Sequence, residues 1–304
     1  MFTTICDAED ATSSIEAMRQ QEEKGYNTSD YFQAHQGEDQ AEPCFRSKGP
    51  LRCEDPVDEN CRFRMTEWCF QVVDVCKYDR ETVEIAISYL DRFLATPKGA
   101  DVLKDRKVFQ LAAMTCLYTA IKIHEPEAME PQVVSRLSRG TYSAEDVEAM
   151  ERMIITAIQW RMNPPTAMSF VRFFMALLPV GAMEEEDRTA AVELAKYQTE
   201  LAVGEYSFVG VNASTIACAA LANALQTLEN VELKHSILEN VSCTVNIDMN
   251  SLLFVTTQES LWTAMGKENR SHQRQLMPQS PAMQKTMERS SAIHGSPRGV
   301  ISQQ

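Results

Sequence analysis

The sequence lacks the motifs by which most enzymes and metal-binding proteins are recognised. It contains no G-x-x-x-x-G-K-[ST], no G-x-G-x-x-G, no H-E-x-x-H and no recognisable nucleophile triad. No two of its nine cysteines are spaced C-x-x-C, and its five histidines are scattered. We therefore expect a non-catalytic protein with no cofactor and no metal site, whose cysteines stay reduced.

Long apolar runs are also scarce. The longest, Val108 to Ile123, covers 16 residues and is interrupted by polar side chains, whereas a membrane span needs about 20 apolar residues. Residues 1–19 contain acidic side chains and no apolar stretch, unlike a signal peptide. These features predict a soluble, intracellular protein.

The sequence has fewer basic than acidic residues, 29 Lys and Arg against 43 Asp and Glu. The net charge is −14, and residues 1–60 carry 14 acidic and 5 basic side chains, a net charge of −9. Residues 266–304 carry 2 acidic and 6 basic side chains, a net charge of +4, so residues 61–265 also hold −9. A folded region of this charge argues against a general nucleic-acid-binding protein.

Neither the alternation of a strand nor a clear hairpin signal occurs between residues 61 and 265. Apolar side chains instead recur at helical spacing. Expected helix starts are Asp79 and Asp105 as caps, Pro131 in a first turn, and Ser143 with Asp146 in a capping box. The pair Pro164-Pro165 then stops helical structure, and a second helical series follows.

This pattern predicts an all-α protein with two tandem five-helix bundles, each built around a central buried helix. Both flanking segments are polar and poor in large apolar residues, so we expect disordered tails. The predicted parts are a mostly disordered acidic segment at 1–60, a first bundle at 61–163, a second bundle at 164–265, and a disordered tail at 266–304.

Two charged residues lie where apolar ones are expected. Lys122 nearly ends the apolar run, and Glu151 lies about 40° from Val147 and about 20° from Ile158 on a helical wheel. Buried Lys and Glu are rare unless they are paired. Either the two form an internal salt bridge, with Lys122 able to reach solvent from its helix end, or both lie on an apolar surface that another protein covers.

Three separated stretches resemble the cyclin box, and they occur in its order. They are "CRFRMTEWCFQVVDVCKYDRETVEIAISYLDRFL", "LAAMTCLYTAIKIHEP" and "TYSAEDVEAMERMIITAIQWRMNPPT". The resemblance covers residues 61–166 well and residues 166–265 in outline. It implies that each half of the predicted core adopts a cyclin fold.

The resemblance also implies roles for individual residues. Lys122 and Glu151 match the lysine and glutamate with which cyclins grip a cyclin-dependent kinase around its regulatory C-helix. Arg62 and Asp91 match a structural pair of the fold. Apolar surface for the kinase would come from Ile123, Leu117 and Ile155.

A substrate-docking groove is the feature that departs from the family pattern. Met65 and Trp68 remain from the motif M-R-A-I-L-x-x-W, but Arg64 stands where isoleucine is common and Gln71 where an acidic residue often lies. The added cation and the missing carboxylate should weaken the docking of basic substrate motifs.

Short motifs lie in the flanking segments. Lys267, Glu268 and Asn269 form a KEN triplet, a candidate degradation signal read by ubiquitin-ligase machinery in cyclins, whereas no R-x-x-L core occurs. Ser280 and Ser296 each precede a proline and are candidate phosphorylation sites.

The resemblance thus implies a cell-cycle cyclin: a non-catalytic regulatory subunit that binds and activates a cyclin-dependent serine/threonine kinase to control cell division. Its expected partners are that kinase and ubiquitin-ligase machinery, with no nucleic acid and no membrane. The expected location is the nucleus and cytoplasm. The alternative is a cyclin-fold transcription regulator or scaffold that activates no kinase. The cyclin class, the kinase and the cell-cycle phase stay open.

Overall fold

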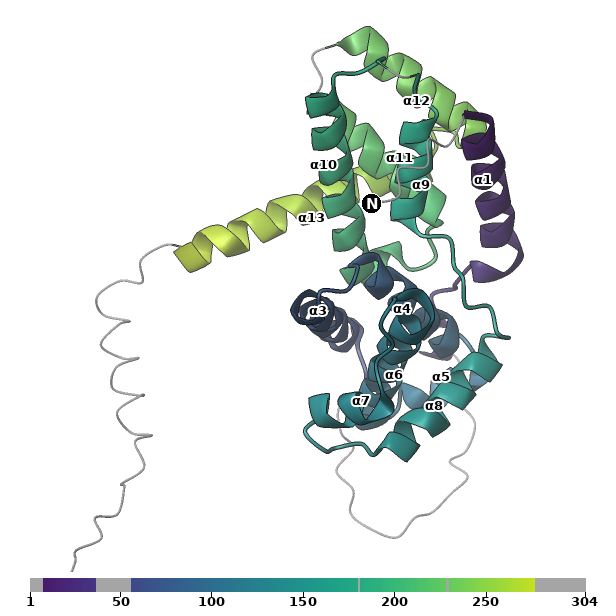
Figure 1. The fold of residues 1–304 in the computed structure, drawn as a ribbon, viewed down its shortest axis with the longest axis vertical. Helices are drawn as coiled ribbons and strands as arrows, with labels where there is room; N and C mark the ends of the chain where they lie inside the picture. The colour runs from purple at the N-terminus through teal and green to yellow at the C-terminus, as the bar shows by residue number, and fades with distance from the viewer. Residues whose placement is uncertain (1–7, 37–55, 180, 228–229, 277–304) are drawn as a thin grey trace, which may run out of the picture. The chain divides into compact units, whose positions relative to one another are not determined.

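A computed structural model of the chain describes residues 8–36, 56–179, 181–227 and 230–276. All regular structure within these ranges is helical. The chain divides into two compact units, Met1–Trp262 and Thr263–Gln304. The first unit contains two tandem helical bundles, and this confirms the predicted fold class (Figure 1).

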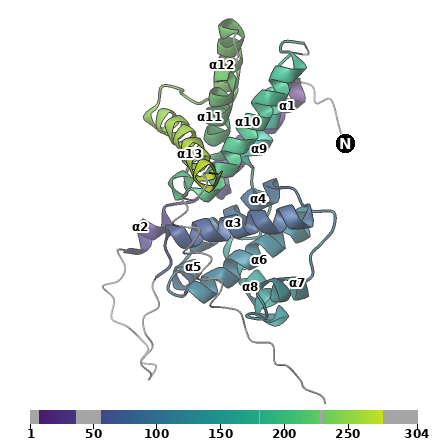
Figure 2. The ribbon, with the colours of Figure 1, turned by 90° about the vertical axis from the view of Figure 1, so that its left-hand side faces the viewer.

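The first bundle is built around one buried helix, α6, which α3, α4, α7 and α8 pack around or beside (Figure 2). Eleven of the 19 residues of α6 are buried. A short helix, α5, was not among the expected helix starts. The bounds are α3 Glu59–Cys76, α4 Glu81–Leu94, α5 Pro97–Val102, α6 Arg106–His124, α7 Pro131–Leu137 and α8 Ala144–Ala157.

Most of the expected helix starts are present as local hydrogen bonds. The side chain of Asp105 accepts from the backbone N–H groups of the first turn of α6, and Pro131 opens α7. Ser143 and Asp146 form the predicted capping box at the start of α8. Asp79 lies two residues before α4, and its side chain accepts from the backbone N–H of Glu81, the first residue of that helix, while Arg80 occupies the cap position.

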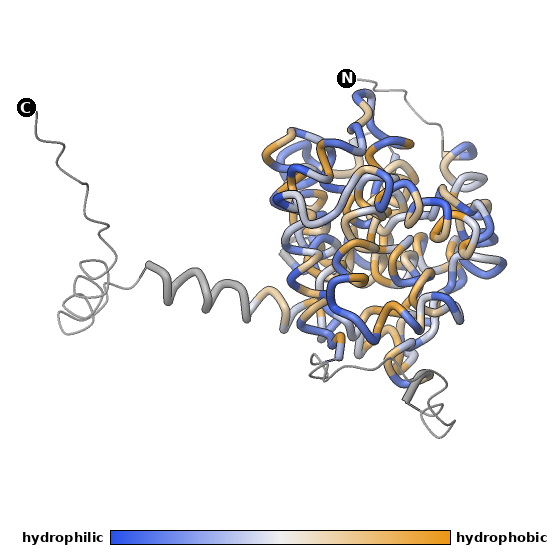
Figure 3. Tube along the Cα trace, turned by 90° about the horizontal axis from the view of Figure 1, so that it is seen from below, coloured by the Kyte–Doolittle hydropathy of each residue, from blue (hydrophilic) through white to orange (hydrophobic). Residues whose placement is uncertain are grey.

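The second bundle repeats this plan around α11, in which 11 of the 12 residues are buried. Apolar and hydrophilic stretches alternate along the trace, as expected for amphipathic helices packed on a core (Figure 3). The bounds are α9 Ala167–Ala176, α10 Glu185–Gly204, α11 Ala213–Ala224, α12 Val231–Val245 and α13 Leu252–Leu276. No helix of the described residues is both long enough and apolar enough to cross a membrane.

The N-terminal segment differs from the sequence-based expectation. Residues 8–36 form α1 Ala8–Gln21, a π-helical turn η1 Glu22–Tyr26 and α2 Tyr31–Gln36. α1 lies beside α9 and α12, where Ala11 and Ile15 are fully buried in the second core (Figure 1). Two apolar side chains one turn apart are enough to dock a short helix. Within an acidic, polar segment so few apolar residues do not produce a helical pattern that sequence analysis can detect.

The C-terminal boundary differs as well. The backbone of α13 continues to Leu276, beyond the predicted end at 265. Residues 267–276 contain Lys, Glu, Arg and Gln, which tolerate a helix, and the first proline comes only at Pro278.

Candidate kinase-binding face

Lys122 and Glu151 come from two helices that pack against each other. Lys122 lies in the last turn of α6, and Glu151 lies in the middle of α8. The Nζ atom of Lys122 is 3.2 Å from Oε1 and 3.1 Å from Oε2 of Glu151. The internal salt bridge, one of the two alternatives, is therefore formed.

This salt bridge sits at the edge of the bundle and is open to solvent on one side. Glu151 is 8% exposed, whereas the side chain of Lys122 is 47% exposed. The hydroxyl of Thr119 donates to Oε1 of Glu151 at 3.2 Å and holds the carboxylate in place. Partial burial works against the ammonium, but the Glu151 carboxylate outweighs it and raises the pKa of Lys122, which stays charged.

The apolar surroundings of the pair agree only partly with the sequence-based prediction. Ile123 is 47% exposed, and Ile155, one turn beyond Glu151, is partly exposed. Leu117 is only 2% exposed and belongs to the first core, so the prediction that it supplies surface is wrong. The reason is that α6 is buried without a break from Ala112 to Ile121, and only its two ends reach the surface.

Two aromatic residues at this face were not predicted. Trp160, just beyond α8, is 74% exposed, and its backbone N–H donates to the carbonyl of Ile155 at 3.0 Å. It adopts φ +60° directly after Gln159 at φ +58°, a backbone conformation uncommon for large side chains. Tyr118 lies one turn before Lys122, whose Nζ is 5.4 Å from the ring centroid. The spacing of Tyr118 one helical turn before Lys122 was the available signal for that residue, whereas Trp160 lies beyond the end of α8 and has no helical spacing from Ile155.

Arg62 and Asp91 form a buried pair at the junction of the two bundles. Nε and Nη2 of Arg62 donate to the two carboxylate oxygens of Asp91 at 2.9 and 2.8 Å. Nη1 of Arg62 donates to the carbonyls of Val203 and Gly204 at the end of α10, at 2.9 and 3.1 Å. The hydroxyl of Tyr31 donates to Asp91 at 3.0 Å. This network joins both bundles and the N-terminal segment.

The predicted docking groove lies along α3. Met65 and Trp68 are half-buried against the first core, and Gln71 and Arg64 are exposed. Substrate binding at this place stays a prediction.

The remaining candidate residues fall where side chains are not described. The backbone of Lys267, Glu268 and Asn269 continues α13, and Ser280 and Ser296 lie outside the described residues. Among the residues that are described, no group of three or more His, Cys, Asp and Glu side chains is arranged to hold a metal ion.

Comparison with known protein families gives two adjacent matches. The model of the cyclin N-terminal domain matches residues 13–163, and that of the cyclin C-terminal domain matches residues 165–292. The first match begins within α1, in agreement with the packing of that helix on the fold.

Individual proteins give the same answer. Cyclin-A2-2 and Cyclin-A2-1 of Arabidopsis thaliana are 27% and 26% identical over 179 and 182 residues, 58% and 59% of this chain. Cyclin-A1-3 of Oryza sativa subsp. japonica is 26% identical over 166 residues, 54% of this chain and 32% of the relative. The chain covers 39% of each Arabidopsis relative, about two fifths of its length.

Solved structures share the fold. A viral cyclin from herpesvirus saimiri superposes with a TM-score of 0.54 at 18% identity, over 69% of this chain and 88% of the viral one. A chain of the CAK complex of Chaetomium thermophilum bound to ATP-gamma-S superposes with a TM-score of 0.50 at 14% identity, over 99% of this chain and 94% of that chain. Since the two family models together match most of its length, the chain belongs to the cyclin family.

Proposed function

We propose that this chain is a regulatory subunit that binds and activates a cyclin-dependent serine/threonine kinase through one surface, the Lys122 face. That face consists of Lys122, Glu151, Ile123, Ile155 and Trp160. The carrying observation is a half-open ion pair beside large apolar side chains that are exposed to solvent. An anchored charge next to exposed aromatic and aliphatic groups is typical of a protein-binding hot spot.

The pair is suited to gripping a kinase helix. Only the Lys122 end of this pair is exposed, so the ammonium can form new hydrogen bonds while it still neutralises the buried Glu151 carboxylate. The Lys122 ammonium can donate to backbone carbonyls at one end of the kinase C-helix, and the Glu151 carboxylate can accept from N–H groups nearby.

Activation then follows from differential binding. A kinase needs its own Lys–Glu pair and its metal-binding aspartate in place before phosphoryl transfer. A partner that binds this arrangement better than the inactive one shifts the equilibrium towards it. ATP, magnesium and the reacting groups belong to the kinase.

The test is binding and activation of a panel of recombinant cyclin-dependent kinases. We expect Lys122→Ala with Glu151→Ala to abolish stable binding and stimulation of kinase activity while far-ultraviolet circular dichroism stays unchanged. The matched control is Lys104→Ala with Asp101→Ala, an exposed ion pair of the same bundle. Unaltered binding by the Lys122 and Glu151 variant would contradict the proposal.

The same experiment separates the rival functions. A scaffold would bind a kinase without stimulating it, and a transcription regulator would bind DNA with a steep salt dependence. The net charge of −9 over residues 61–265 favours the kinase partner over nucleic acid. We further propose that the protein acts in the nucleus and cytoplasm, which fluorescence microscopy of the tagged chain would check.

A further inference from the structure

One buried cation at the junction of the two bundles has no anion opposite it. Arg92 is 7% exposed, and its Nη2 atom has no hydrogen-bond partner within the described part of the chain. Its Nε donates to the carbonyl of Ser88 at 3.2 Å. A buried guanidinium without a carboxylate or phosphate is costly, so this position calls for a reason.

Two carboxylates close to Arg92 and Tyr26 along the chain, Asp91 and Glu22, already have partners. Both oxygens of Asp91 accept from Arg62. Glu22 accepts from Arg19 at 3.1 Å and from the backbone N–H of Ser214 at 2.7 Å. Arg92 is therefore left with aromatic faces.

Those faces come from two tyrosines. The Arg92 guanidinium carbon lies 4.8 Å from the centroid of the Tyr26 ring and 5.6 Å from that of Tyr89. Burial lowers the pKa of Arg92, and the nearby positive charge of Arg161 lowers it further. The side chains of Tyr26, Tyr89 and Cys116 act in the opposite direction and raise it. No acidic side chain figures among these influences.

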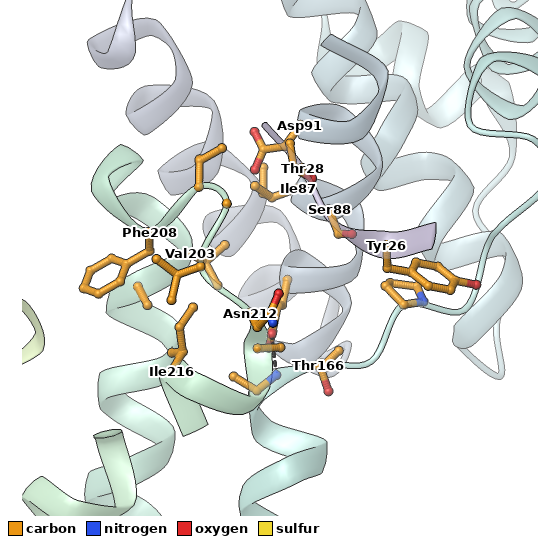
Figure 4. A pocket seen from close by; sticks show the side chains of 18 of the residues that line it. Tyr26, Thr28, Ile87, Ser88, Asp91, Thr166, Val203, Phe208, Asn212 and Ile216 are labelled. Carbon is orange, nitrogen blue, oxygen red and sulfur yellow. Dashed lines mark hydrogen bonds between the residues drawn. The ribbon is translucent and has the colours of Figure 1, made fainter. Parts of the chain in front are cut away.

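A second arginine, Arg161, contacts the π-helical turn η1 that ends at Tyr26. Nη1 of Arg161 donates to the carbonyl of Lys24 at 3.0 Å. It also lies directly against Gly25, where an added Cβ would come within 1.5 Å of it. Tyr26 is half-buried, and its hydroxyl points away from the cavity that its ring helps to line (Figure 4). Arg92 thus lies over the ring of Tyr26, and Arg161 contacts the two residues that precede this tyrosine, whose oxygen points away from the cavity.

We infer that Tyr26 is a phosphorylation site whose phosphate Arg92 and Arg161 bind. A protein tyrosine kinase would supply ATP as the second substrate. The phenol oxygen of Tyr26 forms a bond to the γ-phosphorus, the bond from that phosphorus to the bridging oxygen breaks, ADP leaves with the electron pair, and the phenol proton passes to the kinase base. The dianionic ester gives both guanidiniums charge-assisted hydrogen bonds.

Binding of the phosphate would hold the N-terminal segment more firmly against the folded core. Residues 8–36 contact the second core through Ile15 and the first through Tyr31. A phosphate held between Arg92 of α4 and Arg161 would pin this segment to the first bundle, in addition to the contact of Ile15 with the second core.

The experiment uses the full chain with phosphotyrosine installed at position 26 by genetic code expansion. We expect a melting temperature roughly 2–4 °C higher than that of the unmodified chain, and a second phosphate pKa below its ordinary value of about 6 by ³¹P NMR. Arg161→Gln, at an exposed position, should remove most of both effects, and so should Arg92→Gln if it folds. Phosphotyrosine at exposed Gln132 is the matched control and should titrate normally.

A second arm tests reactivity and the source of the anion. Broad-specificity tyrosine kinase and ATP should label Tyr26 in peptide maps, and Tyr26→Phe should remove that label. The inference is overturned if Tyr26 stays unlabelled while other tyrosines react, or if phosphotyrosine at 26 leaves the melting temperature and the phosphate pKa unchanged. It is also overturned if inorganic phosphate stabilises the Tyr26→Phe chain equally, since that would assign the arginines to a free anion.

Discussion

At the scale of single residues, the Lys122 face illustrates how a charge pair can serve both the free and the bound protein. In the free chain, Lys122 neutralises Glu151 and Thr119 supports the carboxylate. This satisfies a carboxylate that would otherwise be buried alone, and such a group is expensive. Since Lys122 stays half exposed, the pair remains open to another protein. Trp160 is a large exposed side chain just beyond α8, and its backbone N–H bonds the carbonyl of Ile155.

Trp160→Ala should weaken kinase binding at least about tenfold, as is typical for removal of an interface tryptophan. Because the side chain is 74% exposed, the free energy of unfolding should change by less than about 0.5 kcal/mol. Surface plasmon resonance and urea denaturation would measure the two. Val75→Ala, 83% exposed on α3, is the control, and an equal loss for both variants would argue against a specific role for Trp160.

At the scale of elements, helix ends are where the two bundles and the N-terminal segment meet. Glu84 of α4 accepts from the backbone N–H of Ala167 at 2.6 Å, the first residue of α9. Glu22 does the same for Ser214 at the start of α11. Nη1 of Arg62 donates hydrogen bonds to the carbonyls at the end of α10. All three side chains satisfy backbone groups that the helix ends leave unpaired, and the Arg62 cation also matches the sign that a helix C-terminus prefers.

α1 should contribute to stability although it precedes the predicted core. Ile15 is fully buried, so Ile15→Ala should cost about 2–5 kcal/mol of unfolding free energy, whereas exposed Glu16→Ala should cost less than about 0.5 kcal/mol. Chemical denaturation followed by circular dichroism measures both. Equal stability of the two variants would mean that α1 does not dock in solution.

Glu84 should make stability pH-dependent. Burial raises its pKa to about 8; the Ala167 N–H counteracts this and nearby Glu81 adds to it. The folded state therefore holds a proton that the unfolded chain releases near pH 4.5, and stability should fall as pH rises from about 5 to 8. Glu84→Gln should remove a decline on the order of 3 kcal/mol, measured by urea denaturation at several pH values. A decline of the same size in Glu84→Gln would assign it to other groups.

At the scale of the whole molecule, the two bundles lie in one compact unit because polar groups tie them together. Arg62 alone reaches α4, α10 and, through Asp91, Tyr31 of the N-terminal segment. The bundles have separate apolar cores. Val203, Tyr206 and Val209 from the second half also pack against the first core, so this buried network and those apolar contacts together link the bundles.

Arg62→Ala should lower the unfolding free energy by about 3–5 kcal/mol, because it leaves Asp91 buried without its cation. It should also broaden or split the thermal transition seen by calorimetry, as the two cores lose their link. Arg80→Ala breaks two more exposed ion pairs and is the control, with an expected cost of about 1 kcal/mol. A single sharp transition in both variants would place the coupling elsewhere.

The sequence by itself determined the all-α class, the central buried helices and most helix starts, because periodicity and capping are local properties. It also singled out Lys122 and Glu151, since a charge within an apolar pattern is visible without coordinates. Only the tertiary structure decided which neighbours share a surface. It enclosed Leu117, exposed Trp160 and docked α1, because burial depends on what packs from elsewhere in the chain.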